Sequence, residues 1–327
     1  ADANWMRTMT ATVRDLEDEM TFQWLPGLGG RKAALSKAGD SGTSIPIHYE
    51  LNAGIDPEAN LLEVKARIRL PRQLRQAGSE FSLSSALNID ESQPAVEVVA
   101  DEDSPIRRYR LKESASRGVL ELSYRGKIDF GLSDQKEEYT RGFRETRGIV
   151  GTQGIYLDSD SAWVPRFNEQ MLQFDVTLAL PDGWHVISQG DGTSRDNEGN
   201  ARWASESPME QIYLVGGPLQ RVSDSAGAVE LLVYLRERDD ALTQKYLDAG
   251  SRYIEMYRQL IGPYPYSKFA LVENFWETGY GMPSFTLLGP QVIRFPFILH
   301  SSYPHEILHN WWGNSVFVDY ESGNWCE

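Results

Sequence analysis

Three of the chain's five histidines, His300, His305 and His309, lie within ten residues of one another. His305 and His309 are four positions apart, so on a helix both imidazoles project from one face and can bind one metal ion. Glu306 lies beside them, where its carboxylate can activate a water molecule without binding the ion. A histidine pair with this spacing and an adjacent glutamate is typical of zinc hydrolases. The motif predicts a zinc site with Glu306 as the catalytic residue.

The alternative to a metal site is a core helix that carries two packed or solvated histidines. Ser302 is a candidate helix cap, and Pro304 suits the first turn, so the local sequence favours the helix that the motif requires. His300 lies outside the pair, and we expect it to be structural. His48 and His185 fall in strand-like segments, where packing is the expected role.

A catalytic zinc ion takes three protein ligands and keeps one position open for water. Glu327, separated from His309 by 17 residues, is the predicted third ligand. Its alternative is a solvated carboxylate near the end of the chain. Asp319 and Glu321 are further candidates in a segment that has the composition of a connecting turn, and Cys326 is a less usual one.

Residues 305–314, followed by residues 324–327, resemble the zinc core of the aminopeptidase N family of gluzincin metallopeptidases. Residues 253–272 are similar to the helix, Pro-Tyr-Pro turn and strand that precede the active site in this family. Residues 120–126 and 209–217 match the family loosely. The resemblance covers most of the chain and is most specific after residue 253.

The resemblance implies a zinc metallopeptidase that hydrolyses peptide bonds, with zinc as the cofactor and a peptide as the substrate. In this interpretation His305, His309 and Glu327 bind zinc, and Glu306 takes a proton from the attacking water. The segment of Gly279, Tyr280, Gly281 and Met282 is expected to bind an extended peptide by strand addition. The alternative for this segment is a glycine-rich turn.

Two features depart from the family pattern. The spacing to Glu327 is one residue shorter, and Pro283 stands where the family carries a glutamate that holds the substrate's free amine. Glu273 or Glu277 is a candidate substitute, with a structural role as the alternative. Exopeptidase and endopeptidase activities therefore both stay open. A catalytically impaired or inactive peptidase-like binding module and a zinc hydrolase of non-peptide substrates are the rival hypotheses.

The elements that must position these residues divide the chain in two. Alternating apolar and charged residues at 62–70 predict a strand with one face exposed to solvent. Similar runs without helices between them predict a β-sandwich or a saddle-shaped pair of sheets. From Asp239 or Asp240, apolar residues at helical spacing predict a helix that ends by Gly262. Further strands are expected at residues 81–83, 96–99, 109–111, 119–124, 174–180, 184–187, 212–215, 229–235 and 269–272.

We therefore predict a mainly β N-terminal saddle or sandwich domain over residues 1–228. Residues 229–327 are expected to start an α+β domain, which the resemblance identifies as an incomplete thermolysin-like catalytic domain. The family's transition-state tyrosine would lie beyond Glu327.

The composition of this 327-residue chain limits the kinds of partner that it is expected to bind. Its 47 acidic against 32 basic residues give a formal net charge of −15, which disfavours nucleic-acid binding. No apolar run approaches the length of a transmembrane helix. The single cysteine rules out an intrachain disulfide. By analogy with exported bacterial relatives we expect a periplasmic or otherwise exported protein, with the cytoplasm as the alternative, while the oligomeric state stays open.

Overall fold

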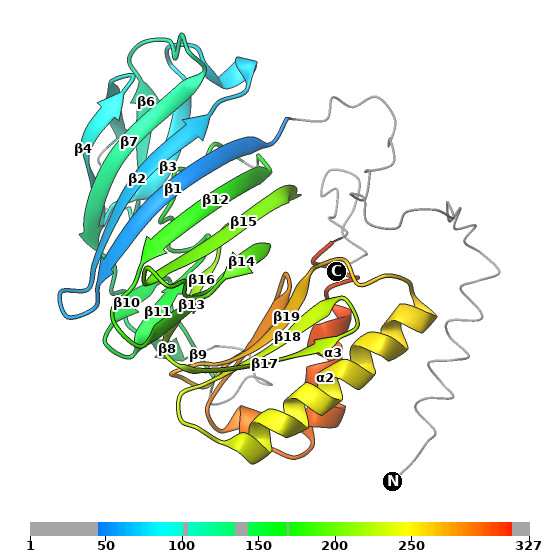
Figure 1. Ribbon diagram of the computed structural model, residues 1–327. Helices are drawn as coiled ribbons and strands as arrows, with labels where there is room; N and C mark the ends of the chain where they lie inside the picture. Colours follow the sequence, from blue (N-terminus) through cyan, green and yellow to red (C-terminus); the bar gives the residue numbers. More distant parts are fainter. Residues whose placement is uncertain (1–44, 101–103, 135–142, 169, 316–327) are drawn as a thin grey trace. The chain divides into compact units, whose positions relative to one another are not determined.

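Alternating apolar and charged residues form an interior strand of the largest sheet. A computed structural model describes residues 45–100, 104–134, 143–168 and 170–315 (Figure 1). In β2 (Leu61–Arg69), Leu62, Val64, Ala66 and Ile68 are buried, while the charged residues between them are exposed. This is the pattern of a strand with one face on a core. β2 pairs antiparallel with β1 (Ile47–Asp56) and β7 (Val119–Lys127).

Within the described ranges, the largest sheet has seven strands in the order β14-β15-β12-β1-β2-β7-β4. β12 runs parallel to β1, whereas the other pairs are antiparallel. The remaining strands of this sheet are β4 (Leu87–Gln93), β12 (Leu172–Ala179), β14 (Asp191–Thr193) and β15 (Asn200–Met209).

Smaller sheets complete the first part of the described chain. β10 (Ile149–Gly151), β11 (Gly154–Leu157), β16 (Leu214–Pro218) and β13 (Trp184–Ile187) form one of them, in that order. β3 (Glu80–Ser84), β6 (Ile106–Leu111) and β5 (Val96–Ala100) form another. β8 (Ser133–Asp134) pairs with β9 (Arg144–Glu145), and a 3₁₀ turn, η1 (Arg72–Leu74), follows β2.

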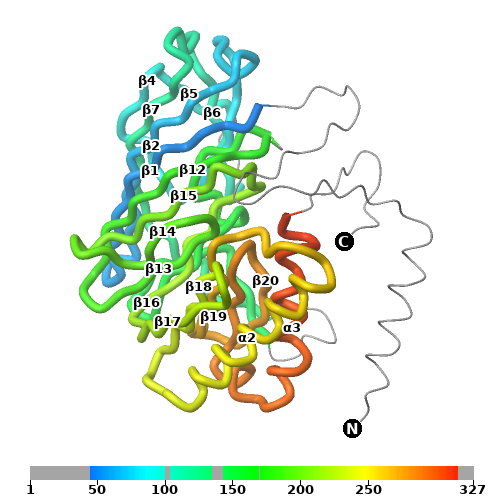
Figure 2. The backbone as a smooth tube through the Cα atoms, turned by 45° about the vertical axis from the view of Figure 1, so that its right-hand side comes forward, coloured from blue at the N-terminus to red at the C-terminus, as the bar shows by residue number. Residues whose placement is uncertain are grey.

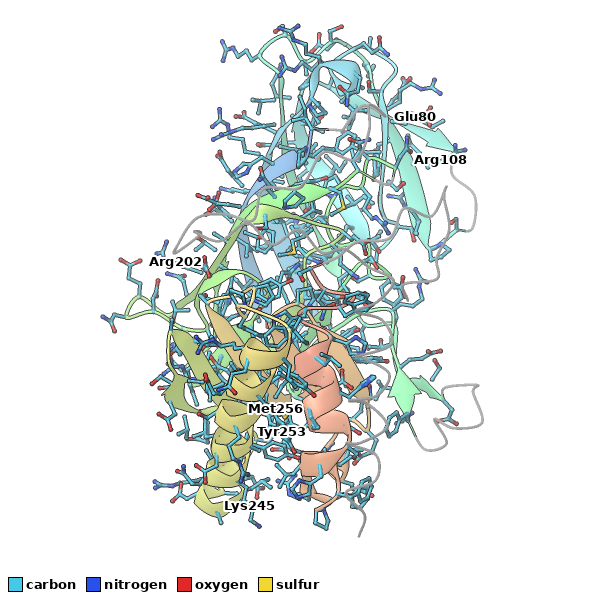
Figure 3. All side chains as sticks on the ribbon, turned by 90° about the vertical axis from the view of Figure 1, so that its right-hand side faces the viewer. Glu80, Arg108, Arg202, Lys245, Tyr253 and Met256 are labelled. Atoms are coloured by element: carbon cyan, nitrogen blue, oxygen red, sulfur yellow. The ribbon has the colours of Figure 1, made fainter. Side chains whose placement is uncertain are left out.

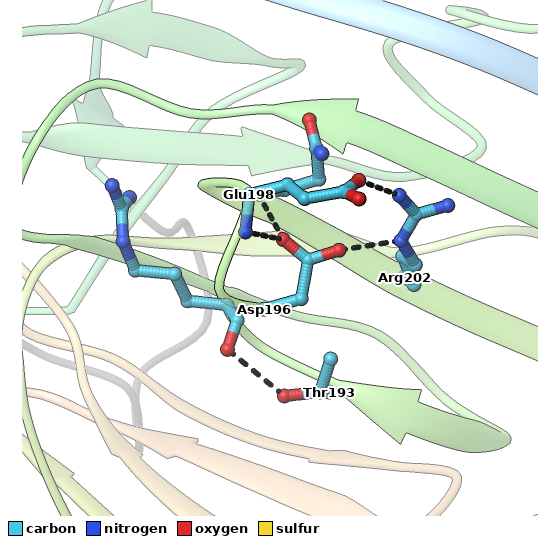
Figure 4. A network of polar contacts seen from close by, with 6 residues as sticks. Thr193, Asp196, Glu198 and Arg202 are labelled. Atoms are coloured by element: carbon cyan, nitrogen blue, oxygen red, sulfur yellow. Dashed lines mark hydrogen bonds and ion pairs between the residues drawn. The ribbon is translucent and has the colours of Figure 1, made fainter.

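A polar network sets the turn between β14 and β15 (Figure 4). Asp196 accepts hydrogen bonds from the main-chain N–H groups of Glu198 and Asn200, at 2.9 and 2.8 Å. Its other oxygen pairs with Arg202, which also pairs with Glu198 at 2.7 Å. The hydrogen bond from Arg202 is the main cause that lowers the pKa of Asp196 to about 2. An aspartate that binds the main chain two and four residues on is a usual device for closing a tight turn.

The second part is built on a mixed sheet with the order β17-β18-β19-β21-β20. β18 and β19 are parallel, so the chain must cross over between them, and helix α2 (Asp240–Leu260) provides that connection. β19 and β21 are also parallel, and β20 pairs antiparallel with β21 at one end of the sheet. These strands are β17 (Gln220–Ala226), β18 (Val229–Leu235), β19 (Lys268–Glu273), β20 (Gly279–Met282) and β21 (Phe285–Leu288).

The limits of α2 follow from its end residues. Asp239 is the N-cap and accepts a hydrogen bond from the N–H of Leu242 at 2.9 Å, which satisfies one of the first unpaired donors of the helix. Gly262, just after the helix, has a φ of +141°, a conformation that L side chains disfavour. The helix buries Tyr246 and Ile254 on one face.

Helix α3 (Ser302–Leu308), which carries the histidine motif, packs on α2. The hydroxyl of Tyr257 donates to the carbonyl of Pro304 at 3.1 Å, and that of Tyr303 donates to the carbonyl of Tyr246 at 3.2 Å. Figure 2 shows α2, α3 and β20 next to one another, and Figure 3 shows Tyr253 on α2 beside α3. Two 3₁₀ turns, η3 (Val292–Arg294) and η4 (Ile298–His300), lead from the sheet to α3.

The prediction of a mainly β chain is confirmed, and the strands predicted at 184–187 and 229–235 match β13 and β18. The boundary after residue 228 stays a prediction; β17, which precedes it, pairs with β18, which follows it. The assignment of the second part to a thermolysin-like domain also stays a prediction. In the described part of the chain, no helix is long and apolar enough to cross a membrane.

Candidate active site

The helix that carries the motif is short and lacks the cap predicted for it. Ser302 is its first residue rather than its cap, and the preceding Ser301 makes no capping hydrogen bond. The Ser301 hydroxyl instead donates to the carbonyl of Phe297 at 2.9 Å, in the preceding turn. Pro304 lies in the first turn, as predicted. The short helix is therefore held mainly by its packing on α2 and not by its own ends.

The two histidines of the motif face each other. The N–H of His309 donates to the carbonyl of His305 at 3.1 Å, so the helical spacing extends to His309, one residue past the helix. Their Nε2 atoms are 2.9 Å apart. Zinc binds histidine nitrogen at about 2.0–2.1 Å, and two ligands of one ion can approach each other this closely. The two imidazoles therefore fit a zinc ion as a pair of nitrogen donors.

The protonation of His305 and the orientation of His309 also suit metal binding. Burial, with a smaller contribution from His309, lowers the pKa of His305 and so favours its neutral form, which binds metals. The Nδ1 atom of His309 lies 3.3 Å from the carbonyl oxygen of Trp312. A proton on Nδ1 would donate to that carbonyl and leave Nε2 as the donor to a metal.

The carboxylate of Glu306 lies against the main chain of β20. A Cβ atom on Gly281 would be 2.2 Å from Oε2 of Glu306 and 3.3 Å from Cδ2 of His309. Any side chain at position 281 would displace the glutamate, so this contact requires glycine. Burial raises the pKa of Glu306 to about 7. A carboxylate with this pKa can exchange a proton with water near neutral pH.

β20, the segment predicted to bind a peptide, is the outermost strand of the mixed sheet within the described ranges. Its register with β21 runs from Gly279 opposite Leu288 to Met282 opposite Phe285. An outer strand presents unpaired main-chain groups that can accept an added strand. Gly279 and Gly281 are exposed and Tyr280 is half-buried, so this edge is accessible.

Glu273 and Glu277, the candidate substitutes for an amine-binding carboxylate, both serve the local structure. Glu273 is buried, pairs with Arg294 at 2.6 Å and accepts the main-chain N–H of Arg236 at 2.8 Å. Glu277 accepts the main-chain N–H of Gln291 at 2.9 Å, where η3 begins. Both carboxylates have structural partners, which agrees with the structural alternative for each.

The predicted third ligand, Glu327, lies outside the described residues, as do Asp319, Glu321 and Cys326. Within the described ranges, no group of three metal-binding side chains comes together. The other histidines lie elsewhere, among their own polar partners. His300 is 3.4 Å from the hydroxyl of Tyr253, His48 pairs with Asp175 at 3.0 Å, and His185 lies 2.9 Å from the hydroxyl of Ser194.

Sequence reasoning missed a buried network behind the site. The N–H of Ser284 donates to Oδ1 of Asn310 at 2.6 Å, and the Ser284 hydroxyl accepts from Nζ of Lys268 at 2.5 Å. Asn310 directly follows His309, and its side-chain amide donates to the carbonyl of Glu306 at 3.2 Å. No pattern in the sequence signals the two contacts of Ser284, because Lys268 and Asn310 are 16 and 26 residues away from it along the chain.

The buried Lys268 predicts a specific dependence of stability on pH. Burial lowers its pKa from 10.5 to about 7, although Asp191 and Glu230 oppose the shift. Between these two values the unfolded chain binds more protons than the folded one, so stability rises with pH by at most about 1.4 kcal/mol per pH unit. Urea unfolding from pH 6 to pH 10 should show this rise above pH 7. In Lys268→Met it should vanish, and parallel curves for the two proteins would contradict it.

Comparisons with known proteins find distant relatives of the chain among the aminopeptidases. It is 23% identical over 323 residues to aminopeptidase B of Rattus norvegicus. The match covers 86% of this chain and 47% of the relative, and aminopeptidase B of Mus musculus gives the same values. The M1 zinc metallopeptidase of Deinococcus radiodurans, solved with a Tyr-Ser-Ala substrate, superposes with a TM-score of 0.58 at 14% identity, over 82% of this chain and 65% of that one. The chain is a distant relative of the M1 aminopeptidases.

The M1 relationship confirms the family-level resemblance predicted from the sequence. An aminopeptidase N family protein from Idiomarina loihiensis shares the fold with a TM-score of 0.57 at 14% identity, over 86% of this chain and 50% of that one. No family model matches the chain. The chain spans about half the length of the curated M1 relatives that it matches.

Proposed function

We propose that the chain forms the metal-binding part of a zinc peptidase that hydrolyses peptide bonds. The observation that carries this proposal is the convergence of His305, His309 and Glu306 beside an accessible strand edge. The Nε2 atoms of the two histidines are 2.9 Å apart, and the glutamate carboxylate lies over the main chain of Gly281. The distant relationship to aminopeptidase B and to the M1 zinc metallopeptidase supports this proposal.

Each residue has a separate task in the proposed reaction. His305 and His309 hold the ion, with Glu327 as the proposed third ligand. Zinc, when bound, supplies the Lewis acid that polarises the scissile carbonyl and makes water acidic enough to attack near neutral pH. The main chain of β20 orients an extended peptide by strand addition. Glu306 then accepts a proton from the attacking water at its carboxylate and passes it on to the leaving amine.

The first test is the zinc content of the purified protein, measured by metal analysis. We expect one zinc per chain, and Ala in place of His305 should lose it, because two remaining ligands hold zinc weakly. His300→Ala is the matched control, since His300 is exposed and lies outside the pair. Equal zinc content in the wild type and both variants would sink the proposed site.

A second candidate function is a peptidase-like module that binds peptides without cleaving them. The observation in its favour is that Pro283 stands in the segment that would face a substrate amine, while Glu273 and Glu277 are engaged elsewhere. Retained zinc and peptide binding without any cleavage would favour this candidate. Turnover of any peptide that depends on Glu306 would exclude it.

A further inference from the structure

The two-residue turn between β20 and β21 has an unusual backbone. It consists of Pro283 and Ser284, and Ser284 has a φ of +70°, in the left-handed region that non-glycine residues disfavour. Proline fixes its own φ near −65°, so the pair matches a type II turn, which usually has glycine at the second position. Such turns are also uncommon in two-residue hairpins. The surrounding structure must therefore hold Ser284 in this conformation.

All three polar groups of Ser284 are bound, each by a different residue. Its N–H donates to the side chain of Asn310 at 2.6 Å, and its carbonyl accepts the N–H of Ala270 at 3.1 Å. Its hydroxyl accepts from Nζ of Lys268 at 2.5 Å. Ser284 itself is fully buried. Water therefore cannot replace any of these partners without rearrangement of the turn.

Lys268 is an uncommon residue for this position. Its side chain is buried at 2% relative exposure, and its ammonium lies 4.7 Å from the ring centre of Trp203 on β15. Asp191 and Glu230 are the acids that act on this ammonium, but none of the ion pairs among the described residues includes Lys268, and Glu230 pairs with Arg221. A buried ammonium without an ion pair is costly, and it is tolerated where its hydrogen bonds are needed. The hydrogen-bond partner of this ammonium is the hydroxyl of Ser284.

This turn joins the two halves of the candidate site. Ser284 comes three residues after Gly281, whose main chain touches the carboxylate of Glu306. Through Asn310 it also binds the segment that carries His309 and Glu306. We propose that Lys268 is a positioning residue that locks Ser284 in its left-handed conformation and thereby fixes the β20 edge against Glu306. This inference rests on the proposed peptidase function for its catalytic consequence.

The test compares Lys268→Met with the double variant Lys268→Met/Ser284→Gly in the full chain. Methionine keeps the bulk but removes the lock, so KM for a peptide should rise by about ten- to a hundredfold, with zinc content unchanged. Amide hydrogen exchange in residues 279–285 should accelerate. Glycine adopts positive φ without help, so the double variant should return both quantities to near the wild-type values. If Lys268→Met folds poorly, Ser284→Ala replaces it in the test. This variant removes only the hydroxyl, and the same rise in KM and the same faster exchange are expected from it.

Tyr234→Phe is the control, because it removes another buried hydrogen bond from the same sheet, to Ser194 at 2.9 Å, without touching the turn. Its KM and its exchange in residues 279–285 should match the wild type. The inference would be overturned if Lys268→Met had the same KM and exchange as this control. It would also be overturned if Ser284→Gly did not restore both quantities in the double variant. If the wild type cleaves no peptide, the proposed function fails, and the exchange data alone decide whether Lys268 locks the turn.

Discussion

Replacement of Glu306 by glutamine is expected to reduce peptide hydrolysis by about 10³-fold while zinc stays bound. Glutamine has the same shape, so the contact with Gly281 and the main-chain bond from Asn310 to residue 306 should persist. An amide cannot accept the proton of the attacking water, and general-base catalysis contributes about 10²–10⁴-fold. The loss should appear in kcat, with KM nearly unchanged, because the residue acts on the reacting water and not on peptide binding.

Glu255→Gln is a matched control for this substitution. Glu255 lies on α2, where it is exposed and pairs with Arg258 at 2.8 Å, so its replacement makes the same chemical change at an exposed position outside the site. Its kinetics should equal those of the wild type. A Glu306→Gln protein that turns over peptide at the normal rate would show that another group activates the water, and the assigned role of Glu306 would be wrong.

The sequence could predict the parts of the site that depend on local spacing. Two histidines four residues apart must share a helix face, and the structure brings their Nε2 atoms to 2.9 Å. Local signals also predicted α2, since Asp239 caps it and Gly262 follows it in a left-handed conformation. The predicted cap at Ser302 was wrong, because α3 is held by contacts with α2 that its own sequence does not encode.

The contacts that fix the site in space were not predictable from spacing. Lys268 precedes an apolar run, and its charge would indicate an exposed strand end, yet it is buried under the turn at Ser284. Nothing near Asn310 in the sequence indicates that its side chain binds a turn 26 residues earlier. These contacts depend on how β19, β20 and α3 pack, and tertiary packing overrides the local pattern. Whether Glu327 completes the site stays a prediction, since it lies outside the described residues.

Substitution of Gly281 by alanine is expected to reduce peptide hydrolysis by about 10²-fold or more. The added Cβ would lie 2.2 Å from Oε2 of Glu306, a distance at which one of the two groups must move. The glutamate is the group that can move, because Gly281 is paired with Thr286 in the sheet. A displacement of about 1 Å at a catalytic group can cost 10²-fold in rate. Steady-state kinetics with a zinc assay would measure the effect.

Gly279→Ala is a control on the same strand. A Cβ at position 279 would meet only ring atoms of Phe143, at 3.5 Å or more, which is ordinary contact. Both substitutions remove one glycine from β20 and reduce the flexibility of its main chain equally. A large loss in Gly281→Ala beside a small one in Gly279→Ala would therefore locate the effect at Glu306. Equal losses would instead mean that β20 needs flexibility along its length, and the close contact of Gly281 with the carboxylate would not be the reason for glycine there.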